Sequence, residues 1–306
     1  MLKFTISTFL LGLSLFADVY NLKPIKITKD ITCVIGDFHP PKKSNNGFVS
    51  NMCYINMGDS LVVLDAGPTY LFAKEFHNLM KKEYPNQKVS NVILSNFHDD
   101  RIQGSSYFRE IGAKIVAYKN LNQDIKDNQS KFQRMGMLLD KEVLVGTKVI
   151  DADVLVEDGY KIKGSKKTIE IIKPSEILEE KSDIAIYSES DSFLFVGNIV
   201  FNGRMLNYTK NSNIDGWIEG LEKLVSLNAK YLLGGHGKEF DKKSYTFSLE
   251  YLKVLKAGVK KAYENDMDRE DIKKTIKVDK FTFMPYFSQL HSSNINNYYD
   301  QLEWEE

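Results

Sequence analysis

Apolar and polar residues alternate in blocks that predict a fold made of both strands and helices. Apolar stretches at Ile31–Ile35 and Phe48–Asn56 predict strands, because a loop rich in proline, asparagine and glycine separates them. Leu61–Leu64 is a continuous apolar run, as in a buried strand, and Val89–Leu94 is expected to be another buried strand. Between them, the apolar residues of Thr69–Glu83 recur at helical spacing and predict a helix. Alternation of strands and helices favours a layered mixed fold.

The second half of the chain continues with shorter strands and longer helices. One polar helix is expected over residues 120–142, and Asp215 is expected to cap a helix that runs to Leu227. Another helix is predicted over Ser244–Glu264, followed by two helical pieces separated near Pro285. The remaining expected elements are a helix at Ser105–Glu110 and strands at Ala113–Ala117, Val154–Val156, Tyr160–Ile162, Thr168–Ile172, Ile184–Tyr187, Phe193–Val196 and Tyr231–Leu233. We therefore expect a domain over residues 18–243 and a helical extension over residues 244–306.

The first 17 residues differ from the rest of the chain. Lys3 precedes an uncharged, mostly apolar run from Phe4 to Phe16, and the small residue Ala17 follows it. This order predicts a secretory signal peptide and a periplasmic or secreted protein. The run is short for a membrane span, so no stable span is expected after cleavage, although an uncleaved anchor is the alternative.

Charge and cysteine content narrow the class of protein further. The 306 residues include 41 basic and 41 acidic side chains, so no overall positive field favours binding to nucleic acid. A small-molecule substrate is expected instead. The two cysteines, Cys33 and Cys53, lie in predicted strands and can pair in an oxidising compartment. The alternative is that both are small buried apolar residues.

Two of the five histidines, His98 and His236, directly follow buried strands. Loops at strand ends are common places for functional sites. Asn96, His98 and Asp100 occupy alternate positions, so an extended loop would point all three the same way, and imidazole with carboxylate suits zinc or a similar ion. The other histidines are not expected to bind metal: one lies in an amphipathic helix, one beside two prolines and one in the tail, namely His77, His39 and His291.

Asn96–Gly104 resembles the His-x-His-x-Asp-His metal motif of the metallo-β-lactamase superfamily. Three further matches follow that family's order, each at the end of a predicted strand: Asp65–Gly67, Gly197–Asn198 and Gly234–Gly237. The segment from Gly197 to Arg204, Trp217 and the tail from His291 to Glu303 are similar to an exported branch associated with quinoprotein and sulfur-oxidation systems. The resemblance covers roughly residues 30–303 and implies an α+β fold, a four-layer αββα sandwich with a C-terminal helical extension.

The resemblance also implies where two metal ions would be held. The first site would use Asn96, His98 and a residue near Glu179. The second would use Asp100, Arg101 and His236. Asn198 stands at the family's bridging aspartate, and Asp65 would lie behind the ligands.

Four of these positions depart from the family pattern: Asn96, Arg101 and Glu179 replace histidines, and Asn198 replaces an aspartate. Arginine cannot ligate a metal, because it stays protonated and has no lone pair to give. A two-zinc centre is therefore not expected. The Asn-x-His-x-Asp-Arg pattern is similar to the mono-zinc subclass, but Asn198 stands where that subclass has a cysteine. The remaining donors, His98, Asp100, His236 and Glu179, predict one zinc ion, or iron or manganese. The alternative is an ion-paired remnant without metal.

The expected activity is that of an exported metal-dependent hydrolase. A bound ion would generate hydroxide for attack on an ester, amide or thioester. Asp100 would orient or deprotonate the water, and Arg101 could offset charge on an anionic substrate. Two alternatives are a catalytically silent binding or accessory protein without metal, and an oxygen- or sulfur-handling enzyme with one iron.

Overall fold

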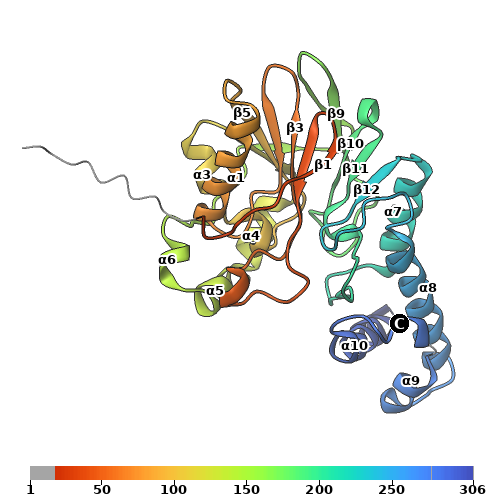
Figure 1. Ribbon diagram of the computed structural model, residues 1–306. Helices are drawn as coiled ribbons and strands as arrows, with labels where there is room; N and C mark the ends of the chain where they lie inside the picture. The colour runs from red at the N-terminus through yellow and green to blue at the C-terminus, as the bar shows by residue number, and fades with distance from the viewer. Residues whose placement is uncertain (1–17, 277, 306) are drawn as a thin grey trace, which may run out of the picture.

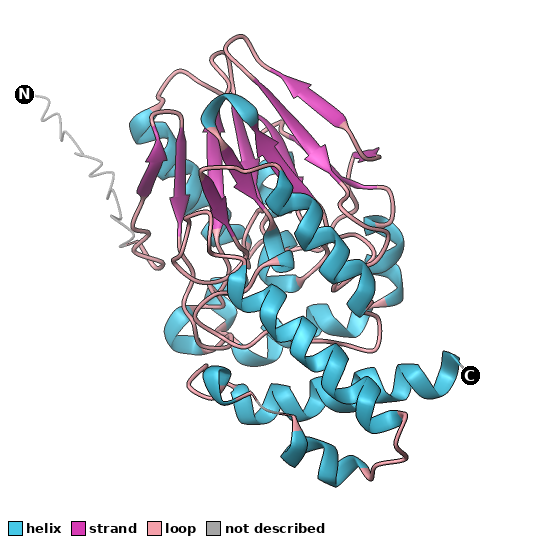
Figure 2. Cartoon of the chain, turned by 90° about the vertical axis from the view of Figure 1, so that its right-hand side faces the viewer, coloured by secondary structure: helices cyan, strands magenta, loops and turns pink. Residues whose placement is uncertain are grey.

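The computed structural model describes residues 18–276 and 278–305, so the predicted signal peptide, residues 1–17, lies outside the described residues. Two β-sheets face each other, and helices cover the outer face of each sheet (Figure 1; Figure 2). The predicted fold class is confirmed: the protein is an α+β, four-layer αββα sandwich with helices at its C-terminal end.

The first sheet has seven strands in chain order within the described residues. Its first four strands pair antiparallel and the later ones parallel. The parallel part places the carboxyl ends of β4 to β7 at one edge, where loops can build a site. The strands are β1 (Ile25–Thr28), β2 (Ile31–Val34), β3 (Met52–Asn56), β4 (Leu61–Leu64), β5 (Val89–Leu94), β6 (Lys114–Tyr118) and β7 (Val154–Val156).

The second sheet has five strands in the order β12-β11-β10-β9-β8. β11 and β12 run parallel, and the other pairs are antiparallel. The strands are β8 (Tyr160–Lys163), β9 (Thr168–Ile172), β10 (Ala185–Ser188), β11 (Phe193–Phe195) and β12 (Tyr231–Leu233). The parallel pair brings the loops after β11 and β12 to the same edge.

Alternation along the strands produces the layers. Val62 and Leu64 of β4 point into the core between the sheets, whereas Leu61 and Val63 pack on the other face against helix residues such as Phe72. Because successive side chains of a strand point to opposite faces, a strand that is apolar at every position is buried on both sides. The continuous apolar runs in the sequence therefore reflect cover from both the facing sheet and the helices.

Helices α1 (Tyr70–Glu83) and α3 (Ser105–Glu110) cover the first sheet, and α7 (Ile214–Ser226) and α8 (Thr246–Tyr263) cover the second. The backbone N–H of Gly216 donates to Asn213 at 2.7 Å, so Asn213 caps α7. The prediction that Asp215 caps this helix was wrong by two residues, because the helix begins earlier and Asp215 lies in its first turn.

The prediction of one helix over residues 120–142 was also wrong. The segment forms three short helices, α4 (Leu121–Asp127), α5 (Gln129–Leu138) and α6 (Lys141–Leu144). Asn128 breaks the first from the second, since its backbone leaves helical geometry and its side chain donates back to the carbonyl of Asp124 at 2.8 Å.

The tail forms α9 (Arg269–Thr275) and α10 (Phe287–Glu305), which confirms two helical pieces separated near Pro285. The shorter helical turns are α2 (Asp99–Ile102), η1 (Lys43–Asn45), η2 (Glu189–Asp191), η3 (Gly197–Ile199) and η4 (Asp279–Phe281). In the part of the chain that the structure describes, no helix is both long and apolar enough to cross a membrane.

Cys33 and Cys53 are directly opposite each other on β2 and β3. Their sulfur atoms are bonded, and both residues are fully buried between the sheets. A disulfide persists in oxidising compartments and is rare in the cytosol of most organisms.

Candidate functional site

Helix α5 and the segments that follow β2, β5, β9, β11 and β12 meet around one cavity of about 230 Å³ at the edge of the sandwich. His98 and His236 both line it, although they come from different sheets. Asp100, Glu179 and Asn198 line it as well. The other lining residues are Pro41, Val49, Asp99, Lys131, Arg134, Glu180, Phe201, Arg204, Asn207 and Thr209.

Arg101 lies beneath the cavity, fully buried, and does not line it. One guanidinium nitrogen donates to Asp65 at 2.6 Å, and another donates to the side-chain oxygen of Asn198. Asp65 also accepts from the backbone and hydroxyl of Ser95, at 2.7 and 2.8 Å. Gly235 permits this arrangement, because a side chain there would collide with the guanidinium. Arg101 is therefore an internal cation that joins three strand-end loops.

The contact with Arg101 fixes how Asn198 faces His98. A guanidinium only donates, so the amide atom that meets Arg101 is the oxygen, and the amide nitrogen faces Nδ1 of His98 at 2.9 Å. Nδ1 therefore accepts, and Nε2 carries the hydrogen, 3.5 Å from Glu180. Burial lowers the pKa of His98, but Glu179 and Glu180 outweigh burial and raise it overall. Nε2 keeps its hydrogen in both the neutral and the protonated ring.

His236 has the opposite arrangement. Its Nδ1 donates to the carbonyl of Val49 at 2.8 Å, which leaves the lone pair on Nε2. Arg204 donates to that lone pair at 3.3 Å, and the carboxylate of Asp100 lies 3.9 Å away. Burial, together with Arg204 and Arg101, holds the pKa of His236 well below its usual range, so the ring is neutral.

The cavity carboxyls differ in charge. Burial raises the pKa of Asp100, but nearby positive charge, that of Arg101 first, outweighs burial, so the pKa falls and Asp100 stays ionised. Burial raises the pKa of Glu179 to about 8, which leaves this side chain mostly protonated at neutral pH. Its Oε2 is buried and has no hydrogen-bond partner in the described structure.

Asn96 lies apart from the cavity, contrary to the idea that it shares a face with His98 and Asp100. Its amide nitrogen donates to Asp183 at 3.0 Å, and its oxygen accepts from the backbone of His98 at 3.0 Å. The chain turns into α2 at Asp99, so the loop is not extended over these residues and the side chains do not alternate. Asn96 therefore stabilises the loop and does not line the cavity.

The remaining histidines lie outside the cavity lining. His77 contacts the hydroxyl of Tyr107 at 2.8 Å, His39 contacts Asp37 at 2.7 Å and His291 contacts the hydroxyl of Tyr251 at 2.8 Å. Each ring therefore has one polar partner, while Nε2 of His291 is buried without a hydrogen-bond partner in the described structure.

Sequence reasoning missed the cationic lining of the cavity. Arg134 pairs with Asp99, and Lys131 pairs with Glu180 at 2.8 Å. Arg204 has no carboxylate within ion-pair distance among the described residues. The signal available in the sequence was only the position of Arg204 shortly after Asn198; nothing in the spacing of Lys131 and Arg134 on α5 points to a site 30 residues away along the chain.

Comparisons with known proteins identify the family to which this chain belongs. The sequence matches the Metallo-beta-lactamase superfamily over residues 45–236. The chain belongs to this superfamily. It is 20% identical over 210 residues to a protein described as metallo-beta-lactamase type 2 from Elizabethkingia meningoseptica, covering 67% of this chain and 76% of that protein.

Solved structures of superfamily members share the fold at low identity. The metallo-beta-lactamase from Pontibacter korlensis aligns with a TM-score of 0.62 at 16% identity, over 76% of this chain and 99% of that chain. A metallo-beta-lactamase from Hirschia baltica aligns with a TM-score of 0.59 at 15% identity, over 76% of this chain and 97% of that chain. The superfamily match ends at His236, before α8, α9 and α10.

Members of the superfamily usually bind zinc, so the donors of this chain can be tested against a zinc site. A histidine ligand donates its second ring nitrogen to an acceptor and binds with the first. His98 cannot do so, because its second nitrogen faces the amide nitrogen of Asn198. His236 has the right tautomer, but a guanidinium lies on its lone pair. Among the described residues, no three histidine, cysteine or acidic side chains are grouped so that they could hold an ion. The residues present do not fit a zinc centre.

Proposed function

We propose that this protein is an exported binding protein of the metallo-beta-lactamase superfamily, whose cavity holds a small anionic molecule on Arg204 instead of a resident zinc ion. The observation that carries the proposal is the contact of Arg204 with a neutral histidine, His236, at 3.3 Å, without a carboxylate in ion-pair distance among the described residues. A guanidinium presents several donors to a carboxylate or another oxyanion. Asp100 acts on Arg204 from beyond ion-pair distance, and an anionic ligand would be a direct counter-ion.

Other cavity groups complement such a ligand. Nε2–H of His98 is a buried donor that makes no hydrogen bond in the described structure, with Glu180 3.5 Å away, and the protonated Glu179 is a second donor. Phe201, which stacks on His236 with ring centroids 5.1 Å apart, gives an apolar wall. A cavity of about 230 Å³ suits a small molecule with one oxyanion and a short apolar part.

Export is part of the proposal, and two features support it. The apolar N-terminus has the order of a signal peptide. The buried disulfide between Cys33 and Cys53 suits an oxidising compartment. Fractionation of cells that express the full chain should recover a shortened protein outside the cytoplasm; recovery of full-length protein in the cytosol would contradict export.

The binding experiment uses the whole protein, purified without chelators. Elemental analysis should give far less than one zinc, iron or manganese per chain. Isothermal calorimetry with acetate, inorganic phosphate and sulfate should detect binding of at least one anion. Arg204→Leu should weaken that binding by about 10- to 100-fold, the loss expected for a hydrogen bond to a charged group. Arg109→Leu is the matched control: Arg109 is a partly exposed arginine on α3 that pairs with Asp153 outside the cavity lining, and this variant should bind as the original protein does. Absence of anion binding, or an unchanged Arg204→Leu variant, would refute the proposal.

A second candidate is the predicted hydrolase with an altered, single-metal site. It is favoured by the tautomer of His236, which suits a ligand, and by the ionised Asp100 beside it. This candidate requires Arg204 to move away from His236. It also requires the ring proton of His98 to move from Nε2 to Nδ1, which faces Asn198. Elemental analysis separates the two candidates: one tightly held metal per chain, with ester or thioester hydrolysis lost in His236→Ala, would support the hydrolase instead.

A further inference from the structure

Residues 202–213, which include Arg204, form neither helix nor strand, and we refer to them as the cavity segment. They connect Phe201, which forms an isolated β-bridge with His236, to α7. The same segment carries Asn207 and Thr209, which also line the cavity. A segment that forms neither helix nor strand must satisfy its backbone groups elsewhere. What holds this cavity segment therefore decides where Arg204 lies.

The C-terminal helix α10 meets the backbone of the cavity segment. The side-chain oxygen of Asn294 accepts from the backbone N–H of Tyr208 at 2.8 Å, and its nitrogen donates to the carbonyl of Leu206 at 3.1 Å. Asn294 is fully buried, as are Leu206 and Tyr208. The amide thus pairs with two backbone groups of the segment, in the way that a neighbouring strand would.

Two more residues on the same face of α10 continue this contact. Asn297 donates to the carbonyl of Tyr208 at 2.7 Å, and Gln301 donates to the carbonyl of Ser212 at 2.8 Å. Residues spaced by three and four along a helix lie on one face, so Asn294, Asn297 and Gln301 form one row. We refer to these three residues as the support row.

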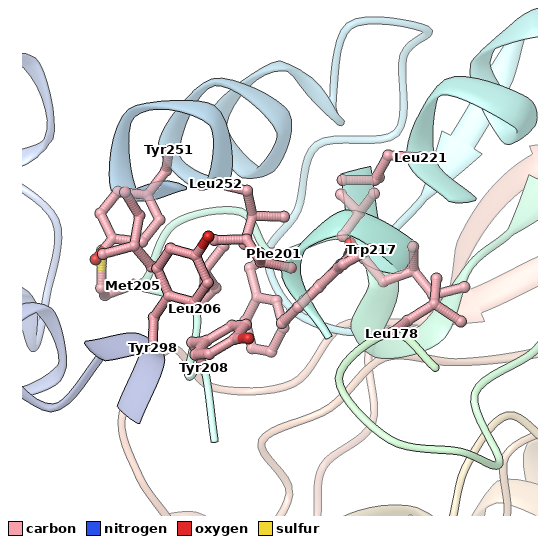
Figure 3. Close-up of a cluster of buried hydrophobic side chains, with 14 of the residues drawn as sticks. Leu178, Phe201, Met205, Leu206, Tyr208, Trp217, Leu221, Tyr251, Leu252 and Tyr298 are labelled. Carbon is pink, nitrogen blue, oxygen red and sulfur yellow. Dashed lines mark hydrogen bonds between the residues drawn. The ribbon is translucent and has the colours of Figure 1, made fainter. Parts of the chain in front are cut away.

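Apolar packing accompanies the support row. Tyr208 and Tyr298 of α10 pack edge to face with ring centroids 5.9 Å apart. Met205, Leu206 and Tyr208 belong to the same buried cluster as Tyr298 of α10 and Tyr251 and Leu252 of α8 (Figure 3). The backbone N–H of Met205 also donates to the carbonyl of Pro285, just before α10, at 3.1 Å. The segment is therefore bound to the C-terminal part of the chain from Met205, the residue directly after Arg204, to Ser212.

We propose that the C-terminal helical extension positions the anion-binding residue of the cavity, with Asn294 as the positioning residue that acts through the backbone of Leu206 and Tyr208. This inference rests on the proposed function for its ligand. The extension lies beyond residues 45–236, the part of the chain that matches the superfamily. Loss of the Asn294 amide would leave two buried backbone groups unpaired and release the segment.

The test compares the full chain with Asn294→Ala and with Asn296→Ala, a control on the same helix outside the support row. Hydrogen exchange followed by mass spectrometry should show residues 202–212 exchanging at least about 10-fold faster in Asn294→Ala, since local opening sets the exchange rate. Binding of inorganic phosphate and sulfate should weaken by about 10-fold in the same variant. Asn296→Ala should match the original protein in both measurements. Should Asn294→Ala fail to fold, Gln301→Ala, at the partly exposed end of the row, serves in its place.

The two readouts separate the inference from the proposed function. If the original protein binds none of the anions, the proposed function fails, and the exchange rates still show whether α10 holds the segment. If anions bind but Asn294→Ala changes neither exchange nor affinity, the positioning role of the extension is wrong. Faster exchange with unchanged affinity would likewise overturn it, because Arg204 would then be placed without the support row.

Discussion

His236 presents the lone pair of Nε2 to Arg204, 3.3 Å away, where a histidine of this superfamily would present it to a metal ion. A fixed positive charge at that position opposes a metal cation. Under the proposed function, the same guanidinium both opposes a metal ion at His236 and binds the anion.

Removal of the Arg204 cation should increase affinity for zinc. We expect Arg204→Leu to bind zinc at least about 10-fold more tightly than the original protein, because the His236 lone pair is freed and a like charge is removed. Calorimetric titration with zinc chloride gives both affinities. His236→Ala in the Arg204→Leu background should abolish the gain. A higher zinc affinity in the original protein than in the variant would contradict this account of the site.

Loss of the Arg101 guanidinium should strongly destabilise the fold. Arg101→Met leaves Asp65 as a buried carboxylate without its cation, and breaking a buried pair costs about 3–5 kcal/mol. Urea unfolding followed by circular dichroism measures the change. Arg269→Met, which removes a partly exposed pair on α9, should cost only about 0–1 kcal/mol. Equal losses in the two variants would show that Arg101 is not an essential internal cation.

Glu179 should make stability fall as pH rises. Burial raises the pKa of Glu179 to about 8 in the folded protein, whereas an unfolded glutamate titrates near 4.3. Between these values the folded state holds a proton that the unfolded state has lost, so the free energy of unfolding decreases with pH. The raised pKa of His98, which Glu179 and Glu180 cause against the effect of burial, acts in the same direction.

Glu179→Gln should flatten this pH dependence by on the order of 1 kcal/mol per pH unit between pH 5 and 8. Urea unfolding at several pH values in that range measures it. Glu142→Gln, in the short helix α6, is the control and should keep the slope of the original protein. Parallel curves for Glu179→Gln and the original protein would mean that Glu179 titrates as an ordinary carboxyl.

Removal of the disulfide should lower stability without changing the cavity. The bond joins residues 20 apart in sequence, and loss of such a cross-link typically costs about 2–4 kcal/mol. Urea unfolding of a Cys33→Ala, Cys53→Ala double variant should show this loss. Anion affinity should stay the same, because the bond lies between the sheets and not in the cavity lining. A double variant as stable as the original would show that the two residues act only as buried apolar side chains.

The sequence by itself determined the layered fold and the place of the cavity. Continuous apolar strands such as Leu61–Leu64 require cover on both faces, which a two-sheet sandwich with outer helices provides. Each strand that ends in polar residues brings them to a sheet edge, so His98 and His236 could be assigned to one site from pattern and resemblance alone.

Only the tertiary structure decided what that site can hold. The state of His98 depends on Asn198, whose orientation depends on Arg101, and these three residues come from two different sheets. The segment that carries Arg204 is held by α10 through Asn294, 86 residues after Tyr208, and we propose that this contact makes Arg204 face His236. Hydrogen-bond direction and charge balance are properties of groups brought together by folding, so local spacing in the sequence does not encode them.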